Sequence, residues 1–194
     1  MHYIHSNNNG GNDPDMTPSR LAEIREKEQR AAAKVLGVKE VIFLQHEDQG
    51  LEETPEFRKE IVRIVRQYQP EIVATSDPYQ RYTVQHRDHR IIGRVVLDAL
   101  FPGARDRMVY PDLLAEGFMP HKVKQVLLWG AGEPNYFSDI TGTFDQKMKA
   151  LRCHISQVGQ LSDLESRMRQ RNEDLAKNQP FKLAEVFHRI DMPW

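Results

Sequence analysis

The sequence predicts an α/β fold, a sandwich of helices around a largely parallel β-sheet. Segments with helical spacing of apolar residues alternate with short apolar runs along residues 17–129. The runs are continuous, which is typical of strands buried on both faces, as in a parallel sheet. Proline, glycine and asparagine residues mark most of the boundaries between them. This alternation of helix and strand predicts the layered α/β class.

The first part of the chain contains two predicted strands and one helix. Residues Met1–Ser6 are interpreted as a short strand, and Asn7–Pro14 as a dense turn that could border a site. A helix is predicted to begin at Thr17-Pro18, with threonine as the cap and proline in the first turn, and to end at Gly37. The apolar run Val41–Leu44 predicts a buried strand.

The same pattern then repeats. Residues Pro55–Tyr68 have the spacing of an amphipathic helix, and Ile72–Thr75 follow as a second buried strand. Residues His89–Leu100 predict another helix, and Val123–Trp129 predict a third buried strand. A short additional strand is expected at Met108–Tyr110.

The C-terminal part is described more coarsely. Residues Thr143–Gly159 predict a helix, and Leu161–Lys177 predict a highly charged helix that is solvated on most of its surface. Residues Lys182–Ile190 fit either a strand or a short helix.

Composition excludes several classes of protein. The 194 residues contain 27 Lys and Arg against 28 Asp and Glu, a formal net charge of −1. This balance argues against a nucleic-acid binder that works through bulk positive charge. Mean hydropathy is −0.65, and no apolar run approaches the ~18 residues of a membrane span. Cys153 is the single cysteine, which excludes an intramolecular disulfide framework and a cysteine-built zinc site. We therefore expect a soluble, cytoplasmic protein without a membrane span.

Three polar loops follow the predicted strands, where sites gather in α/β sheets: Gln45–Gly50, Ser76–His89 and Gly130–Asn135. The second loop ends in the tetrapeptide His86-Arg87-Asp88-His89. Imidazole is a common metal ligand, and a nearby carboxylate can orient it or favour its protonated form. At helical spacing, His86 and His89 would share one face. Capping of a helix start by polar residues explains the same pattern equally well.

The chain resembles the PIG-L / LmbE-like family of zinc-dependent deacetylases, which remove N-acetyl groups from sugar-containing substrates. The resemblance rests on pieces that occur in the family's order, each of them weak alone. They are Asn9–Asp13, Ile24–Glu28 with Ala32-Ala33 and Leu36–Val38, Val41–Leu44 with Glu47-Asp48, His86–His89, Asp139-Ile140, Lys149-Ala150, His154–Gln157 and Ala184–Phe187.

The resemblance implies specific roles. It implies a Rossmann-like three-layer sandwich with one Zn²⁺ ion, for which His89 is a metal ligand. His86 would stabilise the oxyanion of the tetrahedral intermediate and protonate the leaving amine, and Asp88 would orient and charge His86. Arg25 and Asp48 would line the substrate pocket. The implied partner is a small N-acetylated sugar, not nucleic acid, and association into oligomers stays open.

Two departures from the family pattern are visible. Arg87 stands where the family usually has proline. The family's opening HPDD-like motif, which supplies two metal ligands and a general base, does not occur in this sequence. We therefore expect a single deacetylase domain over residues 1–194 that is N-terminally truncated, lacks the first strand and helix, and is inactive on its own, because catalytic zinc takes three protein ligands.

Two alternatives remain open at this point. The chain could be a non-catalytic remnant, a binding module that kept the fold and lost its metal. It could also be another metal-dependent hydrolase, such as a phosphoesterase, that uses the histidines of residues 86–89. The second alternative predicts further His/Asp clusters elsewhere in the chain.

Overall fold

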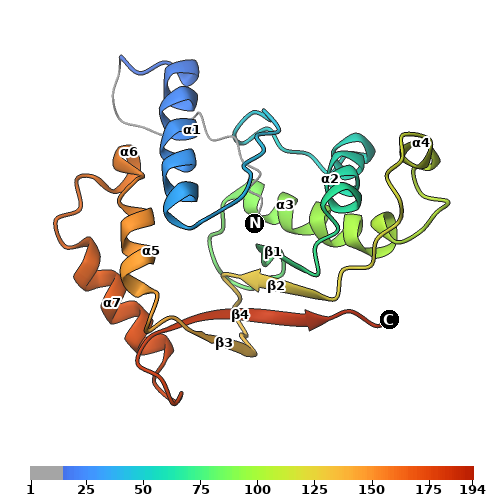
Figure 1. Ribbon diagram of the computed structural model, residues 1–194. Coiled ribbons are helices and arrows are strands. Elements are labelled where there is room, and N and C mark those ends of the chain that lie inside the picture. Colours follow the sequence, from blue (N-terminus) through green and yellow to red (C-terminus); the bar gives the residue numbers. More distant parts are fainter. Residues whose placement is uncertain (1–14) are drawn as a thin grey trace. The chain divides into compact units, whose positions relative to one another are not determined.

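The computed structural model describes residues 15–194, so the predicted strand Met1–Ser6 and the loop Asn7–Pro14 lie outside the described residues. The chain divides into two compact units. One comprises the residues up to Gly50 together with Phe137–Glu185. The other comprises Leu51–Tyr136 and Val186–Trp194. Figure 1 shows the elements of both along the chain.

The unit formed by Leu51–Tyr136 and Val186–Trp194 contains the repeating helix and strand pattern that the sequence predicts. Its helix α3 packs on β1 and against α2, and a π-helical segment, η1, continues α3 (Figure 1). The elements are α2 (Pro55–Tyr68), β1 (Ile72–Ser76), α3 (Arg87–Asp98), η1 (Ala99–Ala104), α4 (Pro111–Ala115) and β2 (Gln125–Trp129).

The strands form one mixed sheet in the order β1-β2-β4-β3, where β3 is Tyr136–Asp139 and β4 is Ala184–Asp191. Strands β1 and β2 are parallel, with Ser76 opposite Trp129 at their carboxyl ends. Strand β4 runs antiparallel to β2. The α/β class is thus confirmed, but the predicted largely parallel sheet is wrong: the sheet is mixed, because β4 runs antiparallel to β2. Of the two structures left open for Lys182–Ile190, the strand is the one that forms.

Helix α2 explains how this unit builds its core. Thr54 caps the helix by accepting a hydrogen bond from the backbone N–H of Phe57, 3.1 Å away. Phe57, Ile61 and Val65 follow at four-residue spacing and are all buried. These residues form the face of the helix that packs into the core. The helix ends before Gln69, its C-cap residue, which adopts a left-handed conformation before Pro70.

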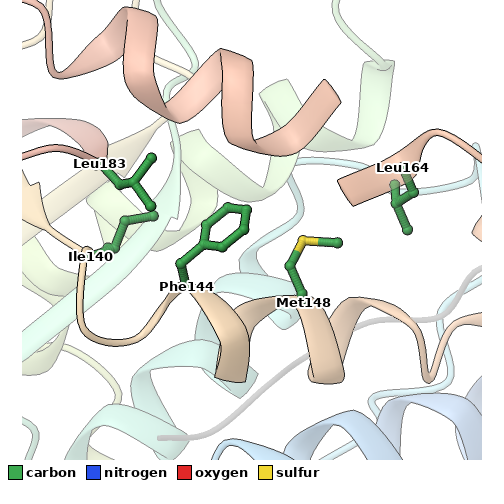
Figure 2. Packing of buried hydrophobic residues seen from close by; sticks show 5 residues of the cluster. All are labelled: Ile140, Phe144, Met148, Leu164 and Leu183. Atoms are coloured by element: carbon green, nitrogen blue, oxygen red, sulfur yellow. The ribbon is translucent and has the colours of Figure 1, made fainter. Parts of the chain in front are cut away.

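The regular elements of the unit that includes residues 15–50 and 137–185 are helices, apart from β3 and β4 residues at its borders. Its helices are α1 (Pro18–Val35), α5 (Phe144–Leu151), α6 (Ile155–Val158) and α7 (Leu164–Leu175). Figure 2 shows the buried cluster of this unit, in which Phe144 and Met148 project from α5 towards Leu164. Ile140 and Leu183 complete the cluster.

A buried carboxylate joins two of these helices. Glu28 of α1 accepts hydrogen bonds from the backbone N–H and the hydroxyl of Ser156 in α6, both at 2.7 Å. These residues belong to two of the sequence pieces that carried the family resemblance. Their spacing of 128 residues in the chain shows why neither piece was informative alone.

Three predicted elements are wrong. Val41–Leu44 is half-buried but forms no strand, because a strand needs a hydrogen-bonded neighbour and none of the strands within residues 15–194 pairs with it. Met108–Tyr110 forms a turn, in which Asp106 accepts from the backbone N–H of Met108. The predicted helix Thr143–Gly159 is divided into α5 and α6 by a turn at residues 152–154.

The structure contains no helix within residues 15–194 that is both long and apolar enough to cross a bilayer.

Candidate functional site

The candidate site lies where β1 ends and α3 begins. The carboxyl ends of parallel strands meet at one edge of a sheet, which is where α/β proteins place their sites. At this edge the backbone N–H of Asp77 donates to the carbonyl of Trp129, 2.9 Å away. The loop that follows returns through Gln85, whose side-chain amide donates to the carbonyl of Asp77 at 2.9 Å. The start of α3 is thereby tied to the end of β1.

His86 is the N-cap residue of α3. Its Nδ1 atom accepts a hydrogen bond from the backbone N–H of Asp88 at 3.2 Å. A ring nitrogen that accepts a hydrogen bond carries no proton, so the proton of the neutral ring is on Nε2. Capping therefore engages the Nδ1 side of the ring, and it fixes the orientation of the imidazole at the start of α3.

His89 lies one turn into α3, and both its backbone and its ring are held. Its carbonyl oxygen accepts a hydrogen bond from the hydroxyl of the buried Ser76. Its ring lies 5.5 Å from the ring of His86 and 5.1 Å from the ring of Trp129, measured between centroids. The two imidazoles of the tetrapeptide thus share one face, as their spacing predicts.

Asp88 stands between these two histidines in the sequence, and its side chain is buried. One of its carboxylate oxygens lies 3.7 Å from the guanidinium of Arg87, and a carboxylate oxygen lies within 4.8 Å of a ring nitrogen of His86. The first turn of α3 therefore supplies two imidazoles and one carboxylate, a donor set that suits zinc. These side chains are of the types that bind zinc, but the resemblance assigns only His89 among them to the metal, so the described residues fit the ion in ligand type and not in ligand number.

Arg87 occupies the first helical position of α3, and its guanidinium donates to the carbonyl of Leu51. Proline is favoured at this position because the first backbone N–H has no partner within the helix. Replacing proline with arginine here leaves the helix start intact. The departure from the family pattern therefore removes no candidate ligand.

The two predicted pocket residues lie in the other compact unit. Arg25 is half-buried on α1, and Asp48 is buried in a turn that follows Gln45. Gln45 has a positive φ of 59° and donates through its side-chain amide to Glu26 at 2.9 Å. A role for Arg25 and Asp48 in substrate binding stays a prediction.

Sequence reasoning missed two residues of the site, Ser76 and Trp129. Each is the last residue of its strand, and the register places them opposite one another. Their position at the end of an apolar run could have identified them, because residues at the carboxyl ends of parallel strands lie at the edge of the sheet where sites form. Ser76 was interpreted as part of a loop, and Trp129 as part of a buried strand.

Gly93 lets α3 approach β1 closely, and it gives a testable prediction. A Cβ atom at this position would lie 2.5 Å from the carbonyl oxygen of Ser76 and about 3 Å from Pro78. Because that oxygen belongs to the backbone, Gly93→Ala should force α3 away from the sheet and lower the free energy of unfolding by about 1–3 kcal/mol. Urea unfolding would measure the change.

A matched control for this variant is Gly132→Ala. A Cβ atom at Gly132 would meet no atom within 4 Å, and φ there is not positive. The control should change stability by less than about 0.5 kcal/mol. Equal unfolding free energies for both variants would contradict the close approach of α3 to β1.

Comparison with known proteins identifies relatives of this chain. A family model described as PIG-L, GlcNAc-PI de-N-acetylase, matches residues 2–100. Diacetylchitobiose deacetylase of Thermococcus kodakarensis is 36% identical over 148 residues, which cover 76% of this chain and 55% of that protein. A probable N-acetyl-alpha-D-glucosaminyl L-malate deacetylase 2 of Bacillus anthracis is 32% identical over 149 residues, with 76% and 62% covered. The chain thus spans little more than half the length of these relatives.

Solved structures share the fold over nearly the whole chain. N,N'-diacetylchitobiose deacetylase of Pyrococcus horikoshii superposes with a TM-score of 0.87 at 26% identity, covering 98% of this chain and 72% of that one. The 4-carboxy-2-hydroxymuconate hydratase GalB of Pseudomonas putida superposes with a TM-score of 0.80 at 20% identity, covering 100% and 85%. The second likeness concerns the fold alone, because one fold can carry unrelated chemistry.

Proposed function

Because this chain belongs to the PIG-L family of de-N-acetylases, we propose that it works as a zinc-dependent N-deacetylase. Its substrates are N-acetylated sugar conjugates such as N-acetylglucosamine derivatives. The supporting observation is the pair of imidazoles in the first turn of α3, His86 and His89, with ring centroids 5.5 Å apart. Deacetylases of diacetylchitobiose and of N-acetylglucosaminyl malate among the relatives support the substrate class.

His89 is assigned to the metal and His86 to the proton transfer. This division of roles comes from the family resemblance, and the capping contact between the backbone N–H of Asp88 and Nδ1 of His86 is compatible with it. When bound, zinc lowers the pKa of a water molecule to about 7 and polarises the acetyl carbonyl. His86 is assigned to donate a hydrogen bond to the developing oxyanion and to transfer a proton to the leaving amine nitrogen. The oxygen of a water molecule bonds to the acetyl carbon as the C–N bond breaks. One proton of that water replaces the proton that His86 gives to the amine nitrogen, the other is lost to solvent, and the amine and acetate leave.

The remaining assignments are those that the family resemblance implies. Asp88 sits beside His86 and orients its ring, while its burial keeps the carboxylate close to the site. Arg25 and Asp48 are assigned to substrate binding on the family resemblance alone. His89 gives one metal ligand, and catalytic zinc takes three. Residues 1–194 alone are therefore expected to release acetate slowly or not at all.

The test is acetate release from N,N'-diacetylchitobiose and from N-acetylglucosamine, measured together with zinc content. It is carried out on residues 1–194 and on the product of the full reading frame that contains them. Zinc-dependent acetate release by the latter supports the proposal. If neither protein binds zinc or releases acetate, the proposal is wrong and the fold serves as a non-catalytic binding module.

A further inference from the structure

Trp129 is an exposed aromatic residue at the end of β2, a strand that is buried on one face and half-buried on the other. Val126 and Leu128 of β2 are buried, but Trp129 leaves 40% of its surface exposed. An indole that could be covered by ordinary packing is costly to leave in water, because aromatic side chains bury large apolar areas. Trp129 thus presents aromatic surface at the edge of the sheet where α/β proteins place their sites.

The backbone holds Trp129 in place. Its carbonyl accepts the backbone N–H of Asp77, and the chain turns at Gly130, whose φ is 72°. The carbonyl of Gly130 accepts from the side chain of Gln80. The indole meets the ring of His89 edge to face, at 5.1 Å between centroids and 79° between planes. This aromatic surface is thus fixed beside the proposed metal ligand.

We propose that Trp129 is the platform on which the pyranose ring of the N-acetylated sugar stacks. The inference rests on the proposed function and deepens it. One face of a pyranose presents mainly C–H groups, and the face of an indole is electron-rich, so the two attract each other as apolar and complementary surfaces. In an N-acetyl sugar, only the amide nitrogen separates the acetyl carbonyl from the ring. A sugar stacked on Trp129 therefore has its acetyl group within reach of His89.

The other aromatic residues of this edge are weaker candidates. Tyr79 and Tyr82, in the loop after β1, are 65% and 105% exposed. A ring as exposed as that of Tyr82 is not fixed by packing, and ordering it would cost side-chain entropy on binding. The side chain of Trp129 is already ordered by its contact with His89, so binding a ligand costs it less side-chain entropy.

The test uses the product of the full reading frame and the affinity for N,N'-diacetylchitobiose, measured by titration calorimetry. Trp129→Leu, which keeps apolar volume without a π face, should raise Kd by about three- to tenfold. Trp129→Phe should restore most of the affinity, because it keeps an aromatic face. Zinc content is measured in both variants and should stay unchanged.

Tryptophan fluorescence locates the contact directly. Trp129 and Trp194 are the two tryptophans of residues 1–194, so any further tryptophan of the reading frame is replaced by phenylalanine. In Trp194→Phe, added sugar should change the emission with the Kd found by calorimetry. In Trp129→Phe, it should leave the emission of Trp194 unchanged.

The outcomes separate the platform from the function. Zinc-dependent acetate release with an unchanged Kd in Trp129→Leu would overturn the platform alone. Sugar that changes the emission of Trp194 but not that of Trp129 would also overturn it. If the unmodified protein neither binds the sugar nor releases acetate, the proposed function fails, and the platform fails with it.

Discussion

Replacing His89 with alanine is expected to abolish zinc binding, whereas His86→Ala is expected to keep zinc and slow acetate release by about 10²–10⁴-fold. The two rings lie on one face of α3, yet their hydrogen bonds differ. His86 caps the helix through Nδ1, while the carbonyl of His89 is held by Ser76 and its ring contacts Trp129. His86→Ala removes the capping ring but leaves the contacts of His89 in place, so His89 should still bind the metal.

Zinc content measured by atomic absorption, together with the rate of acetate release, separates these roles. The protein is the product of the full reading frame. His86→Asn serves as the control for capping, because asparagine is also a good N-cap but is a poor acid. It should match the folding stability of the unmodified protein and still lose rate. Equal zinc content in the His86 and His89 variants would contradict the division of roles.

The fold was largely predictable because periodicity depends on the local sequence. Helix α2 begins and ends where the sequence predicts, at Pro55 and Tyr68, since threonine, proline and apolar spacing all agree there. Val41–Leu44 failed for the opposite reason. An apolar run predicts a strand only if another strand is present to pair with it, and pairing is not a local property.

The site was predictable in its residue types and not in its arrangement. The tetrapeptide at residues 86–89 indicated the start of α3 and its histidines, because their spacing is local. Trp129 reaches His89 across 40 positions of sequence through the register of β1 and β2, which no local pattern encodes. The hydrogen bond to Nδ1 of His86 could not be predicted from the sequence either, because a histidine at this position can cap the helix or serve in the site.

Arg66 is a second residue that sequence pattern could not place. Charged side chains are rarely buried, so the sequence predicts that the arginines of α2 lie on its solvent-exposed face. The structure instead leaves Arg66 only 1% exposed, and burial lowers the pKa of its guanidinium. It donates to carbonyls at the end of η1 and in the segment that follows: Gly103 at 3.0 Å, Ala104 at 3.1 Å, Asp106 at 2.8 Å, Val109 at 2.9 Å and Tyr110 at 3.5 Å.

Arg66→Met should therefore lower the free energy of unfolding by about 3–5 kcal/mol. Methionine fills much of the space but donates no hydrogen bond, so the buried carbonyls of residues 103–110 lose their partner. Arg66→Lys should recover only part of the loss, because an ammonium group cannot reach acceptors spread around a planar guanidinium. Urea unfolding at neutral pH measures all three proteins.

The same helix offers the matched control. Arg63 lies one turn before Arg66, and its side chain is 36% exposed and paired with Glu116. An exposed ion pair contributes about 0–1 kcal/mol, so Arg63→Met should cost little, although the chemical change is identical. Similar losses for the two methionine variants would mean that the loop carbonyls are satisfied in some other way. A large loss confined to Arg66 would show that one buried guanidinium holds residues 103–110 in place.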